Sequence, residues 1–238
     1  NPIDVDDYFV RMHYLDFLYR EPEESGRQAW LGVLRGCPNQ FNRDQRNESS
    51  RCDRVTVSSS FFRSVEFHIK GYYIIRFYRV SFARLPTYRE FVRDLRRVSG
   101  ATAEEVNAAL AEYASEFAAR PDFRTRYEPK SNDAYVDELQ ANVSVQVSNS
   151  QQLKNDLNEG RKNRAQVLRE VVESREVESA EFNRGFVASQ YYGYLRRDPE
   201  QPGFDNWLGY LNQNPQDYYT MVNGFVNSVE YRLRFGRQ

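Results

Sequence analysis

The sequence predicts a mainly α-helical protein built from helical repeat units. Apolar side chains recur every three to five residues in segments such as YFVRMHYLDFLYR, which is the pattern of a helix with one buried face. One turn also occurs twice, as LYREPEESGRQAW (18–30) and LRRDPEQPGFDNW (195–207). Two alternating, Ser-rich tracts, RVTVSSS and NVSVQVSNS, are candidate strands, but each is short, and we interpret them as helix starts or linkers.

The repeated turn belongs to two clear repeat units, residues 8–67 and 182–238. Aligned positions run without a gap from Phe9 on Phe186 to Leu34 on Leu211, and FRSVEF (62–67) is then matched by FVNSVEY (225–231). Two degenerate units, 74–127 and 132–177, lie between them. The polar stretch after Tyr127 is the expected boundary, so we predict two helical domains, 1–127 and 128–238.

Each residue type of the repeated turn can have a structural role. Arginine complements the carbonyl end of a helix, proline prevents its continuation, and glycine allows a tight backbone turn. Tryptophan then falls one turn into the next helix, where it can pack back onto the first. We therefore assign a structural role to Arg20, Pro22, Gly26, Trp30, Arg197, Pro199, Gly203 and Trp207.

Acidic residues in the two turns raise two alternatives, a calcium site and a carboxylate pair for glycoside cleavage. Neither turn has the alternating Asp/Asn spacing of an EF-hand loop, and acids in a tight turn rarely face each other across a cleft. The structural role is therefore favoured over both, and no metal or cofactor is expected. The acids concerned are Glu21, Glu23, Glu24, Asp198, Glu200 and Asp205.

Catalytic motifs are lacking in the sequence. The only histidines are His13 and His68, and the repeat places Gln190 at the position equivalent to His13. No nucleophile elbow, Gly-rich phosphate loop, zinc-protease motif or cofactor fingerprint is present. We expect a protein that is not an enzyme.

Charge is balanced over the chain, with 33 basic and 34 acidic residues, so no overall field directs the protein to nucleic acid. Residues 70–97 interleave basic and aromatic side chains, which we interpret as buried aromatics with a solvated arginine face, rather than as a nucleic-acid site. A basic surface that docks an acidic protein is the alternative. No stretch is apolar enough to span a membrane. Asn47 and Asn142 match the glycosylation pattern, which arises readily by chance.

Cys37 and Cys52 bracket the 13 residues by which the first clear unit exceeds the last. Their spacing fits no zinc site. A bond between them would close a loop with a chain-entropy benefit of about 3 kcal/mol. We predict this disulfide, against the alternative of two free thiols, and the bond implies an oxidising compartment. The first residues lack the features of a signal peptide, and the absence of an initiator Met favours a mature secreted protein or a domain of a longer chain.

The clear units resemble the bacterial domain-of-unknown-function family 4214. The resemblance rests on a helix that ends in Leu-x-Arg-acid-Pro, followed by Gly, Trp and a closing Phe-x-x-Ser-x-Glu-Phe/Tyr. It implies an all-α fold, a secreted or surface location, a binding or assembly role, and a relationship to phycobilisome linker domains. The cysteine-bracketed segment is similar to an insertion in versions from soil-type bacteria, which supports the disulfide.

These observations predict a non-catalytic module that acts outside the cytoplasm, at the cell surface, in secreted form or in the periplasm. Its partner is expected to be another protein or a second copy of itself, because repeated units present similar faces that can associate head to tail. A second hypothesis is a carbohydrate- or matrix-binding accessory domain that uses exposed Tyr and Trp. A third is an enzyme of unrecognised type.

Overall fold

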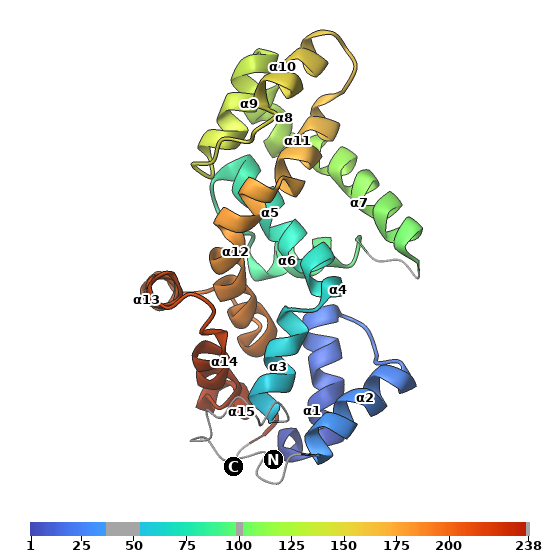
Figure 1. Ribbon diagram of the computed structural model, residues 1–238, viewed down its shortest axis with the longest axis vertical. Helices are drawn as coiled ribbons and strands as arrows, with labels where there is room; N and C mark the ends of the chain where they lie inside the picture. Colours follow the sequence, from blue (N-terminus) through green and yellow to red (C-terminus); the bar gives the residue numbers. More distant parts are fainter. Residues whose placement is uncertain (37–52, 99–101, 237–238) are drawn as a thin grey trace. The chain divides into compact units, whose positions relative to one another are not determined.

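The computed structural model describes residues 1–36, 53–98 and 102–236 (Figure 1). All regular structure in these ranges is helical, so the predicted fold class is confirmed. The tract RVTVSSS opens helix α3 (Arg54–Phe62), and NVSVQVSNS forms turns that lead into α10 (Ser150–Asn158). The predicted disulfide between Cys37 and Cys52, and the Asn47 pattern, lie outside the described residues.

The chain divides into two compact units. Unit 1 comprises residues 1–68 and 186–238, and unit 2 comprises residues 69–185. This division differs from the domains predicted at 1–127 and 128–238, because it groups the first and last repeat units and leaves the stretch after Tyr127 inside unit 2. Helix α12 (Arg175–Gln190) contributes residues to both units.

Unit 1 contains two sets of helices that follow each other in the same order. Elements that precede the cysteine-bracketed segment in the first set have their equivalents 177 positions later in the second set. For elements that follow this segment, the offset is 164 positions. The elements are η1 (Pro2–Asp4), α1 (Asp6–His13), η2 (Tyr14–Leu18), α2 (Glu24–Arg35), α3 (Arg54–Phe62), α4 (Val65–Phe67), the end of α12, η4 (Tyr191–Leu195), α13 (Gln201–Gln213), α14 (Tyr218–Val226) and α15 (Val229–Leu233).

Equivalent elements of the two sets pack on each other in unit 1. Helix α3 lies along α14 (Figure 1). The π-helical turn η2 contacts η4. The ring of Phe17 stands 5.1 Å from that of its equivalent, Tyr194. Phe17 also occupies the space beside Gly193, where a Cβ atom would lie 1.7 Å from the Phe17 ring. Only glycine fits at position 193 against this ring.

A buried carboxylate joins the two sets of helices. Asp16 is 3% exposed and accepts hydrogen bonds from Arg196 at 2.6 and 3.0 Å, and from Arg234 at 2.9 and 3.0 Å. Arg234 also donates to the carbonyl oxygens of Gly193 and Tyr194. The negative charge of the first set is therefore compensated by two arginines of the second.

A buried histidine forms the second polar link. His13 Nδ1–H donates to the Phe9 carbonyl oxygen at 2.8 Å, and Nε2 accepts from the Ser58 hydroxyl at 2.5 Å. The Ser58 hydroxyl in turn accepts from Tyr194. Burial lowers the pKa of His13 from 6.5 to about 3, although the hydrogen bond to Phe9 acts in the opposite direction. The imidazole is consequently neutral in the folded protein.

Unit 2 is arranged around helix α11, which packs against α5, α7 and α9 (Figure 1). Val167, Leu168, Val171 and Val172 form the buried side of α11. The elements of the unit are the end of η3 (His68–Tyr72), α5 (Tyr73–Phe82), α6 (Tyr88–Leu95), α7 (Ala103–Ala118), α8 (Pro121–Tyr127), α9 (Asn132–Ala141), α10, α11 (Arg164–Glu173) and most of α12.

Asp94 is the polar centre of unit 2. It is fully buried and accepts from Tyr78 at 2.8 Å, Tyr113 at 2.9 Å, Arg93 at 2.7 Å and Arg120 at 2.9 Å. Burial alone would raise the pKa of Asp94, but the hydrogen bonds from the two arginines outweigh it and hold the pKa below its ordinary value. Asp94 therefore stays ionised, with its lone pairs occupied.

Replacing Asp16 with Asn is expected to lower the free energy of unfolding by about 2–4 kcal/mol, because Arg196 and Arg234 lose the charge that compensates them. Urea unfolding followed by circular dichroism measures this loss. The matched control is Glu128→Gln, which removes an exposed i,i+4 partner of Arg124 and should cost no more than about 0.5 kcal/mol. Equal losses in the two variants would contradict the role of Asp16.

His13 makes the stability of the protein depend on pH. Because the unfolded chain binds a proton near pH 6.5 and the folded protein does not, stability falls as pH drops below 6.5, by about 1.4 kcal/mol per pH unit until pH approaches 3. His13→Gln should remove this pH-dependent part of the stability. Glutamine suits the position, since Gln190, the equivalent of His13, donates at 3.2 Å to the carbonyl oxygen of Phe186, the equivalent of Phe9. The free energy of unfolding of both proteins is measured between pH 7 and 4.5. Parallel pH profiles of the two proteins would refute the contribution of His13.

Candidate functional site

The first repeated turn is held by an arginine shared between two glutamates. Arg20 donates to Glu66 at 2.8 and 3.0 Å and forms an ion pair with Glu23 at 2.8 Å. Its guanidinium carbon lies 4.9 Å from the centre of the Tyr14 ring. Hydrogen bonding to Glu66 raises the pKa of Arg20, and hydrogen bonding to Arg20 lowers that of Glu23. We call Arg20, Glu23, Glu66 and the adjacent Val65 corner 1.

The second turn repeats this arrangement. Arg197 donates to Glu230 at 2.6 and 3.0 Å, pairs with Glu200, and lies 5.3 Å from the centre of the Tyr191 ring. Each of these residues is the counterpart of its corner 1 equivalent, at the offset of 177 or 164. We call Arg197, Glu200, Glu230 and the adjacent Val229 corner 2.

The glycine of each turn accommodates a tyrosine hydroxyl. A Cβ atom added to Gly26 would lie 2.4 Å from the Tyr14 hydroxyl oxygen, and one added to Gly203 would lie 2.5 Å from that of Tyr191. Close approach of this hydroxyl is therefore the reason for glycine at both positions. The tight backbone turn that we predicted there is wrong, because Gly26 and Gly203 lie inside the helices α2 and α13 and neither has a positive φ. Tyr14 and Gly26 are brought together by the fold of the turn.

Each first helix ends on a left-handed residue. Tyr19 has φ 55° and its equivalent Arg196 has φ 52°, and the next N–H bonds back to the carbonyl of Tyr14 or Tyr191 at 3.4 and 3.5 Å. Such a left-handed residue closes the carbonyl end of a helix, usually as glycine or asparagine. From the sequence we expected arginine and proline to end the helix, and the left-handed residue was not foreseen because neither Tyr nor Arg indicates it.

The tryptophans pack on the next helix of their own set. The Trp30 ring lies 5.3 Å from Phe61, and the Trp207 ring lies 6.1 Å from the equivalent Phe225. Phe61 and Phe225 stand edge-on to Tyr14 and Tyr191, at 5.0 Å in both cases. Tryptophan, phenylalanine and tyrosine thus form one aromatic contact chain in each set.

Each residue of the stretch Ser-Val-Glu-Phe/Tyr has a distinct place. Ser64 and Ser228 cap a helix N-terminus, the glutamates pair with the corner arginines, and Phe67 and Tyr231 are buried. The valines face solvent, with Val65 74% and Val229 67% exposed. Exposed valine at two equivalent positions is unexplained by packing within the chain.

Unit 2 contains partial versions of the corner. Ala83 is left-handed, and the following Arg84 lies 5.0 Å from the Tyr78 ring, with the spacing seen from Tyr14 to Arg20. Arg84 pairs with Glu90 at 2.8 Å. Its pKa is raised by the Glu90 hydrogen bond, and the charge of Asp122 acts in the same direction. At the end of residues 132–177, Ser174 bonds to the N–H of Val177 at 3.3 Å, as Ser64 and Ser228 do to their own aromatic residues.

The turn acids proposed as alternative ligands are engaged within the chain. Glu21 pairs with Arg11, Glu24 with Arg27, and Asp205 accepts from Gln201, while Glu23 and Glu200 belong to the corners. Over the ranges that the structure describes, no group of three or more His, Cys, Asp or Glu side chains converges as metal ligands do. Of the histidines, His13 lies in the core without solvent access, and His68 begins η3.

The basic tract of residues 70–97 is paired with acids. Five of its seven aromatic residues are buried as predicted, namely Tyr72, Tyr73, Phe77, Tyr78 and Phe91, whereas Phe82 and Tyr88 are half-buried. Most of its arginines lie on the solvated face that we expected, since Arg84, Arg93 and Arg97 are exposed, whereas Arg76 is only 7% exposed. Several of these arginines also form ion pairs. The pairs are Arg76–Glu178, Arg79–Glu181, Arg84–Glu90, Arg93–Asp94 and Arg97–Glu116.

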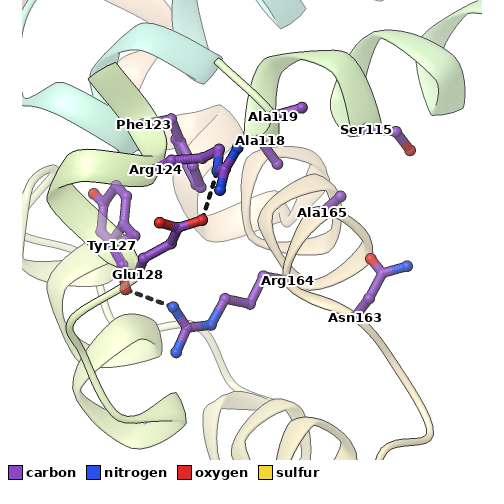
Figure 2. Close-up of a pocket in the computed structure, with 10 residues that line it drawn as sticks. All are labelled: Ser115, Ala118, Ala119, Phe123, Arg124, Tyr127, Glu128, Asn163, Arg164 and Ala165. Carbon is purple, nitrogen blue, oxygen red and sulfur yellow. Dashed lines mark hydrogen bonds and ion pairs between the residues drawn. The ribbon is translucent and has the colours of Figure 1, made fainter. Parts of the chain in front are cut away.

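Two further features of unit 2 bear on binding. Asn142 of the glycosylation pattern uses its side-chain amide to donate to Val80 and Tyr127, at 2.8 and 3.0 Å. A surface hollow of about 500 Å³ lies between the ends of α7, α8 and α11 (Figure 2). It is lined by Ser115, Ala118, Ala119, Phe123, Arg124, Tyr127, Glu128, Asn163, Arg164 and Ala165.

The charged side chains at this hollow form ion pairs or hydrogen bonds within the chain. Arg124 pairs with Glu128 at 2.5 Å, and Arg164 donates to the carbonyl oxygen of Tyr127 (Figure 2). Arg164 also donates to the carbonyl oxygen of Lys130. Phe123 and Tyr127 are buried, so neither offers an open aromatic face. The hollow is a weaker candidate site than the corners.

The fold and the corners define an all-helical protein that carries the same ion-paired turn at two places. Comparison with protein families finds that residues 177–235, which contain corner 2, match the family described as Domain of unknown function (DUF4214). The resemblance predicted from the sequence is thus confirmed over this segment. Comparisons with curated proteins and with solved structures find no match. Within the described ranges, no helix has the length and apolar character needed to cross a bilayer.

Replacing Gly26 or Gly203 with Ala is expected to lower the free energy of unfolding by about 1–3 kcal/mol, because the new Cβ collides with a tyrosine hydroxyl. Adding Tyr14→Phe to Gly26→Ala should restore part of the loss. The controls are Gly32→Ala and Gly209→Ala, which are themselves equivalent positions with open space around the new Cβ; they should stabilise by up to about 1 kcal/mol. Thermal unfolding measures these changes in stability. A loss of stability that Tyr14→Phe leaves unchanged would refute the collision between the new Cβ atom and the tyrosine hydroxyl.

Proposed function

We propose that this protein is a non-catalytic module that works at the cell surface or in secreted form by binding another protein, including a second copy of itself. One observation carries the proposal. The most exposed large apolar side chains of the described residues, Val65 and Val229, occupy equivalent positions in the two corners.

A single exposed valine requires no explanation, since folded proteins leave many apolar atoms in contact with water. An exposed valine that recurs at equivalent positions of two copies does require an explanation. Leu233, one helical turn after Val229, is 54% exposed, and Ile69 takes the equivalent place after Val65 with 41% exposure. Apolar residues that remain exposed at matched positions, beside a fixed ion pair, are typical of a contact surface.

We further propose that residues 8–67 and 182–238 are two copies of one domain, and that residues 74–127 and 132–177 are degenerate copies. Support comes from the matched ion pairs, left-handed residues and tyrosine–glycine contacts of the two corners, together with the partial version at Arg84. The relationship to phycobilisome linker domains, and the extracellular location that the cysteines favour, belong to this proposal.

Size-exclusion chromatography with light scattering tests binding to a second copy. The wild-type mass is expected to rise above the 28.1 kDa of one chain as concentration increases, with and without reducing agent. Val65→Asp together with Val229→Asp should restore a monomer. Gln151→Asp, an exposed change of the same charge in unit 2, should leave association intact. A wild-type protein that stays monomeric at all concentrations would rule out self-assembly.

Binding of a carbohydrate or matrix polymer is the second candidate. Trp30 and Trp207 are only half-buried at their equivalent positions, so part of each indole is open to solvent. Stacking of sugars on these rings would change tryptophan fluorescence on titration with soluble polysaccharides. A saturable change that is lost in Trp207→Phe would favour this function over protein binding.

A further inference from the structure

Beyond the exposed valines, we infer that unit 2 carries two complementary surfaces that join two copies of this chain. The exposed side of α6 in one copy docks on the exposed side of α7 in a second copy. Both helices belong to unit 2, so each chain presents both surfaces. The contact is independent of Val65 and Val229, which belong to unit 1.

The exposed side of α6 consists of arginine alone. From residue 88 to residue 98, the exposed residues are Arg89, Arg93, Arg96 and Arg97. We call these four residues the arginine face. The two acids of this stretch lie away from it, because Glu90 is half-buried against Arg84 and Asp94 is fully buried. A surface that carries negative charge is therefore the complement of α6.

Helix α7 presents the opposite charge. It contains no Lys or Arg, and its exposed residues are Ala103, Glu104, Glu105, Asn107, Ala108, Ala111, Glu112 and Ser115. Arg169 of α11 donates to Asn107, but it also pairs with Glu173. Because small side chains separate the glutamates, a second helix can approach α7 closely.

The two surfaces also match in spacing. Exposed residues at intervals of four form one triplet in each surface, Arg89, Arg93 and Arg97 at α6 and Glu104, Ala108 and Glu112 on α7. Side chains four residues apart are neighbours on a helix surface, and at 1.5 Å per residue the outer members of each triplet are about 12 Å apart. The outer arginines can thus meet the two glutamates, while Ala108 leaves room for Arg93 between them.

Charge complementarity favours a second copy over nucleic acid as the partner. Phe91 is buried and Tyr88 is half-buried, so α6 offers no aromatic platform on which bases could stack. No ion pair of Arg89, Glu104 or Glu112 is found within the part of the chain that the structure describes. Each copy therefore supplies unpaired charges of both signs to the proposed contact.

Light scattering at low ionic strength tests the contact. The full chain carries Val65→Asp and Val229→Asp, so that the valines do not contribute. We expect this protein to associate in about 0.02 M NaCl and to have a mass close to the 28.1 kDa of one chain in about 0.5 M NaCl, because salt screens exposed ion pairs. The chromatography that tests the valines is accordingly run in about 0.5 M NaCl, where the α6–α7 contact is screened.

Charge reversal identifies the residues of the contact. Arg89→Glu and Glu112→Arg should each weaken association by about three- to thirtyfold, because an attraction becomes a repulsion. An equimolar mixture of the two variants should associate again, since the reversed charge on α6 of one then meets the reversed charge on α7 of the other. If the two helices run parallel, Glu104→Arg takes the place of Glu112→Arg in this mixture. The control is Arg124→Glu, an equal change of charge at an exposed arginine of α8, which should leave association unchanged.

Three results would overturn the inference. They are a chain that stays monomeric in about 0.02 M NaCl, association that Arg89→Glu leaves unchanged, and mixtures with both acid variants that stay dissociated. A monomeric chain that binds a single strand of oligo(dT) through Arg89 would assign the arginine face to nucleic acid and exclude the second copy as its partner.

Salt separates this contact from the proposed function of the valines. Association that persists in about 0.5 M NaCl and is lost with Val65→Asp and Val229→Asp supports the valine surface, whether or not α6 and α7 associate. Salt-sensitive association of the valine variant, restored in the mixture, supports the α6–α7 contact, whether or not the valines bind. Each proposal can therefore fail while the other stands.

Discussion

The fold of each clear repeat depends on an arginine that lies against a tyrosine ring while two glutamates share its charge. The arginine comes from the end of one helix, one glutamate from the start of the next, and the other from a helix more than 30 positions further along the chain. The same tyrosine reaches a glycine across the turn. Three segments are thereby fixed around one side-chain stack, and the Ser-capped helix with its valine is placed by that stack.

Much of the fold was predictable from the sequence because it depends on local patterns. Helical periodicity indicated the all-α class, and the turn written twice indicated Arg20 and Arg197, the arginines of the two corners. Most aromatic residues of the basic tract were correctly placed in the core. The sequence also held a signal that we did not use: Arg20 and Glu66, and again Arg197 and Glu230, are opposite charges at matched positions of both copies. Such a recurrence indicates a contact.

Other features could not be predicted, since they depend on distant segments meeting. Asp16 reads as an ordinary polar residue of an amphipathic helix, and nothing near it shows that Arg196 and Arg234 will enclose it. Tyr19 adopts a left-handed conformation that its side chain does not favour, because the hydrogen bond back to Tyr14 requires it. The grouping of the first and last repeats in one compact unit likewise follows from packing between residues about 180 positions apart.

The difference between the equivalent positions 16 and 193 has a consequence for how such a chain can evolve. At these equivalent positions the copies have become opposites, with an acid that neutralises two arginines in the first and a bare backbone that admits Phe17 in the second. Gene conversion that copied either sequence over the other would leave Arg196 and Arg234 without their shared counter-charge, or would place a carboxylate where the phenylalanine ring lies. The two copies can therefore no longer replace each other, because each depends on the residue that the other has at this position.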